Sequence, residues 1–154
     1  MISDEKLKEY RHEILSKHNH LDILISSIIC AHYFPNFPIP QGFFSNVLYQ
    51  QPLSYSSRLN MLRKIYRERD IYNKKYFKKL KRMGEIRNSL AHSEMVIITK
   101  NGEEHIYNPK NFDKEIDFDE EYKEYIILEE EISKSLINVY ENFGGILLHK
   151  KPKF

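Results

Sequence analysis

A helical pattern of apolar residues runs through the first 34 residues of the chain. Apolar or half-apolar side chains recur in alternating steps of three and four: Leu7, Tyr10, Ile14, His18, Leu21, Ile25, Ile28 and His32. This spacing predicts one long helix from about Asp4 to Phe34, with Ser3 as its N-cap. The helix should end there because three prolines, Pro35, Pro38 and Pro40, follow directly.

An irregular connection and two further helices are expected next. Residues 35–54 should pack on the helices as a loop with one short helix around Phe43 to Tyr49. A second long helix should have Ser56 or Ser57 as its N-cap and reach Asp70 or Ile71. A third should begin near Asn73 and bury one side, on which the spacing also places Arg87. Its apolar positions are Phe77, Leu80, Met83 or Gly84, Leu90 and Ala91.

The last part of the chain changes to a strand pattern and then returns to a helical one. Strand-favouring residues flank Asn101-Gly102, a preferred type I′ turn pair, which predicts a β-hairpin from Met95 to Tyr107. A final helix should run from about Asp119 to Phe143 and stop at Gly144-Gly145. The predicted fold class is all-α: an up-and-down bundle of four to five helices, antiparallel to their neighbours, with a small β-hairpin insertion at about residues 95–107. Residues 1–143 should form a single domain, and residues 144–154 a flexible tail.

Composition narrows the class of protein. The chain has 154 residues and one cysteine, so we expect one core without disulfides. No apolar run reaches the roughly 20 residues that span a bilayer, and the acidic start lacks the order of a secretory signal. We therefore expect a cytoplasmic protein with no membrane partner. Cys30 lies in an apolar run and is expected to be a buried thiol.

Charge is distributed unevenly although the net charge is only +2. Between Arg58 and Arg82 eleven Lys or Arg accompany two acids, and between Glu103 and Glu131 twelve acids accompany three Lys. Two explanations stay open: two helix faces that attract each other across the bundle, or a basic surface that binds RNA phosphates. The candidate RNA-binding residues are Lys74, Lys75, Lys78, Lys79 and Arg82.

Polar groups suited to phosphate chemistry occur together in the segment RNSLAH, residues 87–92. Asn88 and His92 are four residues apart and share a helix face, and Arg87 can bend toward the same spot. His92 would be the general acid or base, Arg87 would hold the phosphate oxygens, and Asn88 would orient either. A second copy across a two-fold axis would supply a second histidine. Gly84 indicates the close approach of another backbone, at a helix crossing or at that axis.

At these residues the sequence resembles the HEPN superfamily, whose signature is Arg, usually followed by Asn, with His four to six residues after the Arg. IRNSLAHS at residues 86–93 matches this signature without gaps. LDILISSIICAHYF resembles the long helix of the family, and FFSNVLYQQPLSYSSRLNMLRKI resembles the Phe-rich loop and following helix of its small prokaryotic members. The resemblance implies a homodimeric helical bundle that cleaves RNA without a metal in toxin or phage-defence settings. Its partners would be RNA and an antitoxin or other defence-system protein.

The resemblance leaves two alternatives open. Some family members have lost activity, so the chain could be a non-catalytic module that binds RNA, nucleotide or a protein partner. It could also be an unrelated helical interaction protein in which Arg87 and His92 pair with Glu85 or Glu94. One toxin branch of the family, regulated by a nucleotidyltransferase, has a modified Tyr where this chain has Glu94, which argues against that regulation.

One acidic residue and the remaining histidines complete the candidate chemistry. Asp22 interrupts the apolar pattern one turn after His18, and it either supports Arg87 or His92 or is a solvated residue. We interpret the other histidines as surface or helix-stripe positions. No set of residues has the spacing of metal ligands, and there is no Gly-rich phosphate loop, so neither a metal nor a cofactor is expected.

Overall fold

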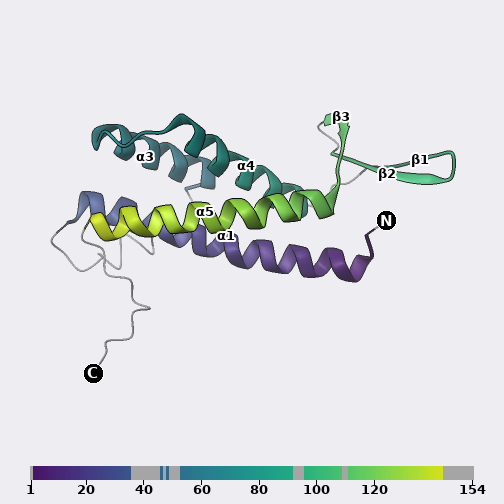
Figure 1. Cartoon of the computed structure of the whole chain (residues 1–154), viewed down its shortest axis with the longest axis horizontal. Coiled ribbons are helices and arrows are strands. Elements are labelled where there is room, and N and C mark those ends of the chain that lie inside the picture. The colour runs from purple at the N-terminus through teal and green to yellow at the C-terminus, as the bar shows by residue number, and fades with distance from the viewer. Residues whose placement is uncertain are drawn as a thin grey trace, which may run out of the picture.

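Four long helices and a small antiparallel sheet make up the described part of the chain (Figure 1). The structure is a computed structural model that describes residues 2–35, 46, 48, 53–91, 96–108 and 111–143. In chain order the elements are α1 (Asp4–Tyr33), α3 (Tyr55–Glu68), α4 (Lys74–Ala91), β1 (Val96–Lys100), β2 (Glu103–Asn108), β3 (Asn111–Glu115) and α5 (Phe118–Asn142). The predicted fold class, an all-α bundle with a β-hairpin insertion, is confirmed.

The first helix begins and ends where the sequence predicts. The hydroxyl of Ser3 accepts a hydrogen bond from the backbone N–H of Lys6 at 3.3 Å, as an N-cap does. Asp4 and Glu5 occupy the first turn, where negative charge is favourable. At the other end, the Phe34 amide still donates to the Cys30 carbonyl at 2.8 Å. One helix therefore spans almost the whole length of the bundle.

The second helix starts slightly earlier than predicted. Its N-cap is Ser54, whose hydroxyl accepts from the backbone N–H of Ser57 at 3.1 Å, so the prediction of Ser56 or Ser57 as the cap is wrong. Three serines in four residues are equivalent as caps, and the choice of Ser54 places Tyr55 in the helix, where it packs on α1 and α4. At the start of α4 the prediction holds, since Asn73 accepts from the amides of Lys75 and Tyr76.

The predicted hairpin is present, and a third strand extends it. Lys100 pairs with Glu103, while Asn101 and Gly102 have φ of 53° and 82°, which are the backbone angles of a type I′ turn. β3 was not predicted, because its sequence NFDKE is polar and poor in strand-favouring residues. It joins the edge of β2 and leads directly into α5.

The helices do not all alternate in direction. α3 runs parallel to α1, because Asp22 and His32 of α1 contact Arg58 and Glu68 of α3 in the same order. The expectation of an up-and-down bundle with antiparallel neighbours is therefore wrong for this pair, and it is also wrong for α1 and α5, which pack on each other in parallel. A connection as long as residues 35–53 can bring the chain back along the bundle, whereas a short one cannot. α4 is antiparallel to both α3 and α5, and α5 runs parallel to α1 (Figure 1).

The core lies where the four helices meet. Its fully buried side chains come from all four helices: Ile14, Leu21, Ile25, Ile28, Leu62, Ile65, Leu80, Met83, Ile86, Tyr125, Ile132 and Leu136 are among them. Arg11 of α1 donates from Nε to the Leu90 carbonyl at 2.8 Å and so ties the last turn of α4 to the bundle. This contact fixes the part of α4 that carries Arg87 and Asn88.

Several predictions fall outside the described residues. These are the catalytic role of His92, the pairing of Glu94, most of the short helix around Phe43 to Tyr49, the stop at Gly144-Gly145 and the tail of residues 144–154. None of the helices that the structure describes has both the length and the apolar character of a membrane span.

Candidate functional site

A pocket of about 730 Å³ lies between α1, α3 and α4. Arg87 and Asn88, two of the three predicted catalytic residues, line it from α4. The third, His92, lies outside the described residues. The other walls come from α1, with His18 and Asp22, and from the start of α3. The predicted signature thus reaches a real concavity rather than a flat helix surface.

Arg87 and Asn88 are joined inside this pocket. Nη1 of Arg87 donates to the side-chain oxygen of Asn88 at 2.8 Å, so the long Arg side chain bends toward its neighbour as expected. Nε of Arg87 is buried and has no hydrogen-bond partner among the described residues. If the chain were an unrelated interaction protein, Arg87 could pair with Glu85, but the carboxylate of Glu85 lies 3.6 Å from Lys81 instead. Arg87 is consequently a cation that no carboxylate neutralises directly within the described structure.

The second guanidinium of the pocket, Arg58, is fully engaged. Its Nη2 and Nε lie 3.0 Å and 3.2 Å from the two carboxylate oxygens of Asp22, and its Nη1 donates to the carbonyls of Leu48 and Leu53 at 2.8 Å and 3.0 Å. The side chains of Arg58 and Asp22 are only 12% and 19% exposed. Arg58 therefore connects α1 to the chain before α3 and fixes one wall of the pocket.

Asp22 contacts Arg58 rather than Arg87, and the sequence reasoning missed this partner. Burial raises the pKa of the Asp22 carboxyl, while the positive charges of Arg58 and, farther away, Arg87 act in the opposite direction. Asp22 is neither a solvated residue nor a direct partner of Arg87. A signal was available, because Arg58 falls toward the inner side of the second predicted helix, where a charge needs a partner.

His18 is the one imidazole among the described residues of the pocket. It is 3% exposed, its Nδ1 lies 3.0 Å from the Tyr125 hydroxyl, and its ring centroid lies 4.6 Å from that of Tyr55. Burial, with added repulsion from Arg87 and Arg58, lowers the pKa of His18 to about 3. The helical spacing predicted His18 as a helix-stripe residue and did not indicate its place in the pocket. Its spacing of four residues from Asp22 was the signal that could have revealed this.

Gly84 meets an aromatic ring and not a backbone. A Cβ at residue 84 would lie 2.7 Å from Cε1 of Tyr55, and the hydroxyl of Tyr55 donates to the Leu80 carbonyl at 2.8 Å. The expectation of another backbone at Gly84 is therefore wrong, and this glycine gives no support for a two-fold axis. Because Gly84 has no side chain, the ring of Tyr55 can lie between His18 and α4.

The five candidate RNA-binding residues divide into two groups. Lys79 and Arg82 face α5, where Glu131 lies 2.5 Å from Lys79 and Glu124 lies 2.7 Å from Arg82. For these two, attraction between helix faces explains the positive charge. Lys74, Lys75 and Lys78 are exposed, and none of them has an ion pair with any described residue.

The described residues contain no group of three or more His, Cys, Asp or Glu that could hold a metal ion. Comparisons of the chain with models of known protein families, with curated proteins and with solved structures find no match. The geometry of the pocket and the sequence signature are therefore the basis for a function.

Proposed function

We propose that the chain is a metal-independent endoribonuclease of the HEPN type that acts as a toxin or phage-defence effector. The observation that carries the proposal is the Arg87 guanidinium, held against Asn88 in a pocket between three helices, without a carboxylate partner among the described residues. A guanidinium in that state can bind two oxygens of one phosphate. Asn88 keeps its amide nitrogen available for a third contact.

In the proposed reaction the 2′-oxygen of a ribose attacks the adjacent phosphorus. A base removes the proton of the 2′-hydroxyl, and an acid gives a proton to the leaving 5′-oxygen. The products carry a 2′,3′-cyclic phosphate and a 5′-hydroxyl end. Arg87 stabilises the charge that builds up on the phosphate oxygens, and His92 transfers the protons because its ordinary pKa is about 6.5.

The state of His18 favours a composite site built from two copies of the chain. His18 lies in the pocket, but with a pKa of about 3 it stays neutral and is a poor base at neutral pH. We therefore assign the acid and the base of the proposed reaction to two copies of His92, one from each protomer of a homodimer. The proposal therefore includes dimerisation with the two α4 helices close to each other.

The test is cleavage of single-stranded RNA in EDTA by the wild-type chain and by His92→Ala. We expect wild-type cleavage and a loss of about 100-fold or more in the variant, with unchanged helical content by circular dichroism. Lys8→Ala replaces an exposed residue of α1 and is the matched control. This variant should cleave like the wild type. Equal cleavage by all three proteins would point to a contaminating nuclease and contradict the proposal.

One observation favours a second candidate, a non-catalytic module that binds RNA or nucleotide in the same pocket. The described part of the pocket offers binding groups, and its single imidazole is held neutral. For this candidate a 2′-O-methyl RNA should bind to both wild type and His92→Ala, with no cleavage of ordinary RNA by either. Binding should still depend on Arg87.

A further inference from the structure

The cations of α3 and α4 are held in two different ways. Toward α5, carboxylates neutralise Lys79 and Arg82. On the outer side of α3, aromatic rings hold the arginines: the guanidinium of Arg63 lies 5.5 Å from the Phe77 ring, and that of Arg67 lies 4.8 Å from the Tyr72 ring. A ring positions a guanidinium and leaves its charge in place, whereas a carboxylate cancels it.

Lysines of α4 continue this outer side toward the pocket. Lys74, Lys78 and Lys81 follow one another in steps of four and three, so they share one face of the helix. Lys81 also lines the pocket, so this face leads directly to it. Its contact with Glu85 at 3.6 Å joins two exposed side chains and is a weak neutralisation. The row from Lys74 to the pocket residue Asn88 covers about 20 Å along the helix.

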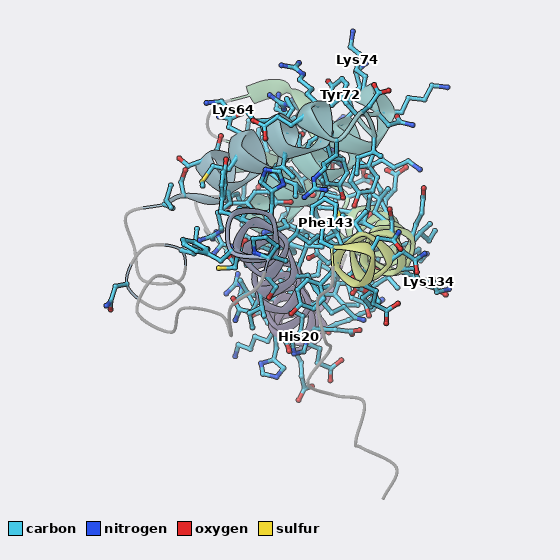
Figure 2. The ribbon with its side chains drawn as sticks, turned by 90° about the vertical axis from the view of Figure 1, so that its left-hand side faces the viewer. His20, Lys64, Tyr72, Lys74, Lys134 and Phe143 are labelled. Carbon is cyan, nitrogen blue, oxygen red and sulfur yellow. The ribbon has the colours of Figure 1, made fainter. Side chains whose placement is uncertain are left out.

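These side chains form one surface, which we name the α3–α4 basic face. It consists of Arg63, Lys64, Arg67, Lys74, Lys78 and Lys81. Figure 2 shows Lys64, Tyr72 and Lys74 gathered on one side of the molecule, away from His20 and Lys134. Of these six cations, only Lys81 has an ion pair with a described residue. The acid at the end of α3, Glu68, is turned to His32 of α1 at 3.0 Å.

We propose that single-stranded RNA enters the Arg87 pocket along the α3–α4 basic face. This inference rests on the proposed function and adds the path of the substrate. A phosphate backbone is a linear polyanion, and it matches a row of cations that keeps its charge and ends at a guanidinium in a pocket. Arg67 is exposed and already restricted by the Tyr72 ring, so binding a phosphate should cost it little side-chain freedom. Arg63 is restricted by the Phe77 ring and by a hydrogen bond from its Nη1 to the side-chain oxygen of Asn60 at 3.2 Å.

The experiment compares two charge-matched double variants in a binding assay that does not depend on cleavage. Lys74→Gln/Lys78→Gln removes two cations of the face, and Lys8→Gln/Lys134→Gln removes two exposed cations elsewhere. The probe is a short fluorescent 2′-O-methyl single-stranded RNA, which cannot be cut, titrated by anisotropy at several salt concentrations. Circular dichroism checks that both variants remain folded.

We expect the face variant to bind at least five-fold more weakly than wild type and the control variant within two-fold. The slope of log affinity against log salt should become shallower by about 1.4 in the face variant, since each lost phosphate contact removes about 0.7. Equal weakening in both variants, or competition by a polyglutamate peptide at equal charge concentration, would overturn the RNA path. Face-dependent binding without cleavage of ordinary RNA would support the path while contradicting the nuclease.

Discussion

The ring of Tyr55 lies so close to Gly84 that a Cβ on residue 84 would lie 2.7 Å and 2.9 Å from two of its carbons. The ring cannot move away easily, because its hydroxyl donates a hydrogen bond to the Leu80 carbonyl and the ring of His18 lies beside it, with centroids 4.6 Å apart. α3, α1 and α4 meet at this contact, directly beside the pocket. The contact therefore links the packing of the bundle to the shape of the proposed active site.

The substitution Gly84→Ala should lower the free energy of unfolding by about 1–2 kcal/mol, measured by urea denaturation. Overpacking against the Tyr55 ring costs more than the roughly 1 kcal/mol that Ala gains over Gly in a helix. In a Tyr55→Leu background the same substitution should be neutral or stabilising. A stabilised Gly84→Ala single variant would show that the ring gives way and that the contact is loose.

The free energy of unfolding should decrease as the pH is lowered below 6.5, because of His18. Above pH 6.5 this imidazole is neutral in both the folded and the unfolded chain, so it has no effect there. Below that pH the unfolded chain binds a proton that the folded chain, with a His18 pKa of about 3, does not bind. The free energy of unfolding should drop by about 1 kcal/mol per pH unit from this source.

His18→Phe, which keeps a ring beside Tyr55, isolates this contribution. Urea denaturation at pH 6 and pH 5 should show a smaller loss for this variant than for wild type, by about 1 kcal/mol. Only the difference between the two proteins in the slope of unfolding free energy against pH matters, because the other histidines are present in both. Identical slopes would mean that His18 is protonated in the folded chain.

Replacing Arg58 should reduce stability more than replacing its partner Asp22. Arg58→Leu leaves the Asp22 carboxylate and two backbone carbonyls without their donor, so we expect a loss of about 2–3 kcal/mol. Asp22→Asn keeps the carbonyl contacts of Arg58 and should cost about 1 kcal/mol or less. Thermal or urea unfolding measures both. An equal or larger effect of Asp22→Asn would contradict the role of Arg58 as the connector.

Arg82 and Lys79, the two cations that face α5, should contribute differently to stability. Replacing either one should have little effect on RNA binding. Arg82 is 31% exposed and contacts both Glu121 and Glu124, so Arg82→Gln should cost about 1 kcal/mol. Lys79 and Glu131 are 38% and 55% exposed, so Lys79→Gln should be almost neutral. Urea denaturation measures the stabilities. A five-fold loss of RNA affinity in either variant would place RNA on this side of α4.

The sequence predicted the helices well because each has local signals. Ser3 and Asn73 are strong N-terminal signals, and the Asn101-Gly102 pair specifies its turn through residues that tolerate positive φ. The direction in which each helix runs through the bundle has no such local signal in the sequence. The parallel arrangement of α1 and α3 depends on how a long connection returns, and no periodicity encodes that return.

The candidate site was predictable only in part, for a similar reason. Arg87 and Asn88 are neighbours in the chain, so their meeting follows from helix geometry alone. The meeting of His18, Asp22 and Arg58 depends on contacts between helices that are far apart in sequence. Gly84 was identified as a close approach, but an aromatic ring and a backbone produce the same signal in a sequence.

The most direct test of the account is the single-turnover rate of RNA cleavage by Arg87→Gln in EDTA, relative to wild type. If the Arg87 guanidinium binds the phosphate in the transition state, the rate should fall by about 100-fold or more. The wild-type products should carry 2′,3′-cyclic phosphate ends, and the folded state should be unchanged by circular dichroism. A wild-type rate in Arg87→Gln would contradict the claim that this pocket is the site of cleavage.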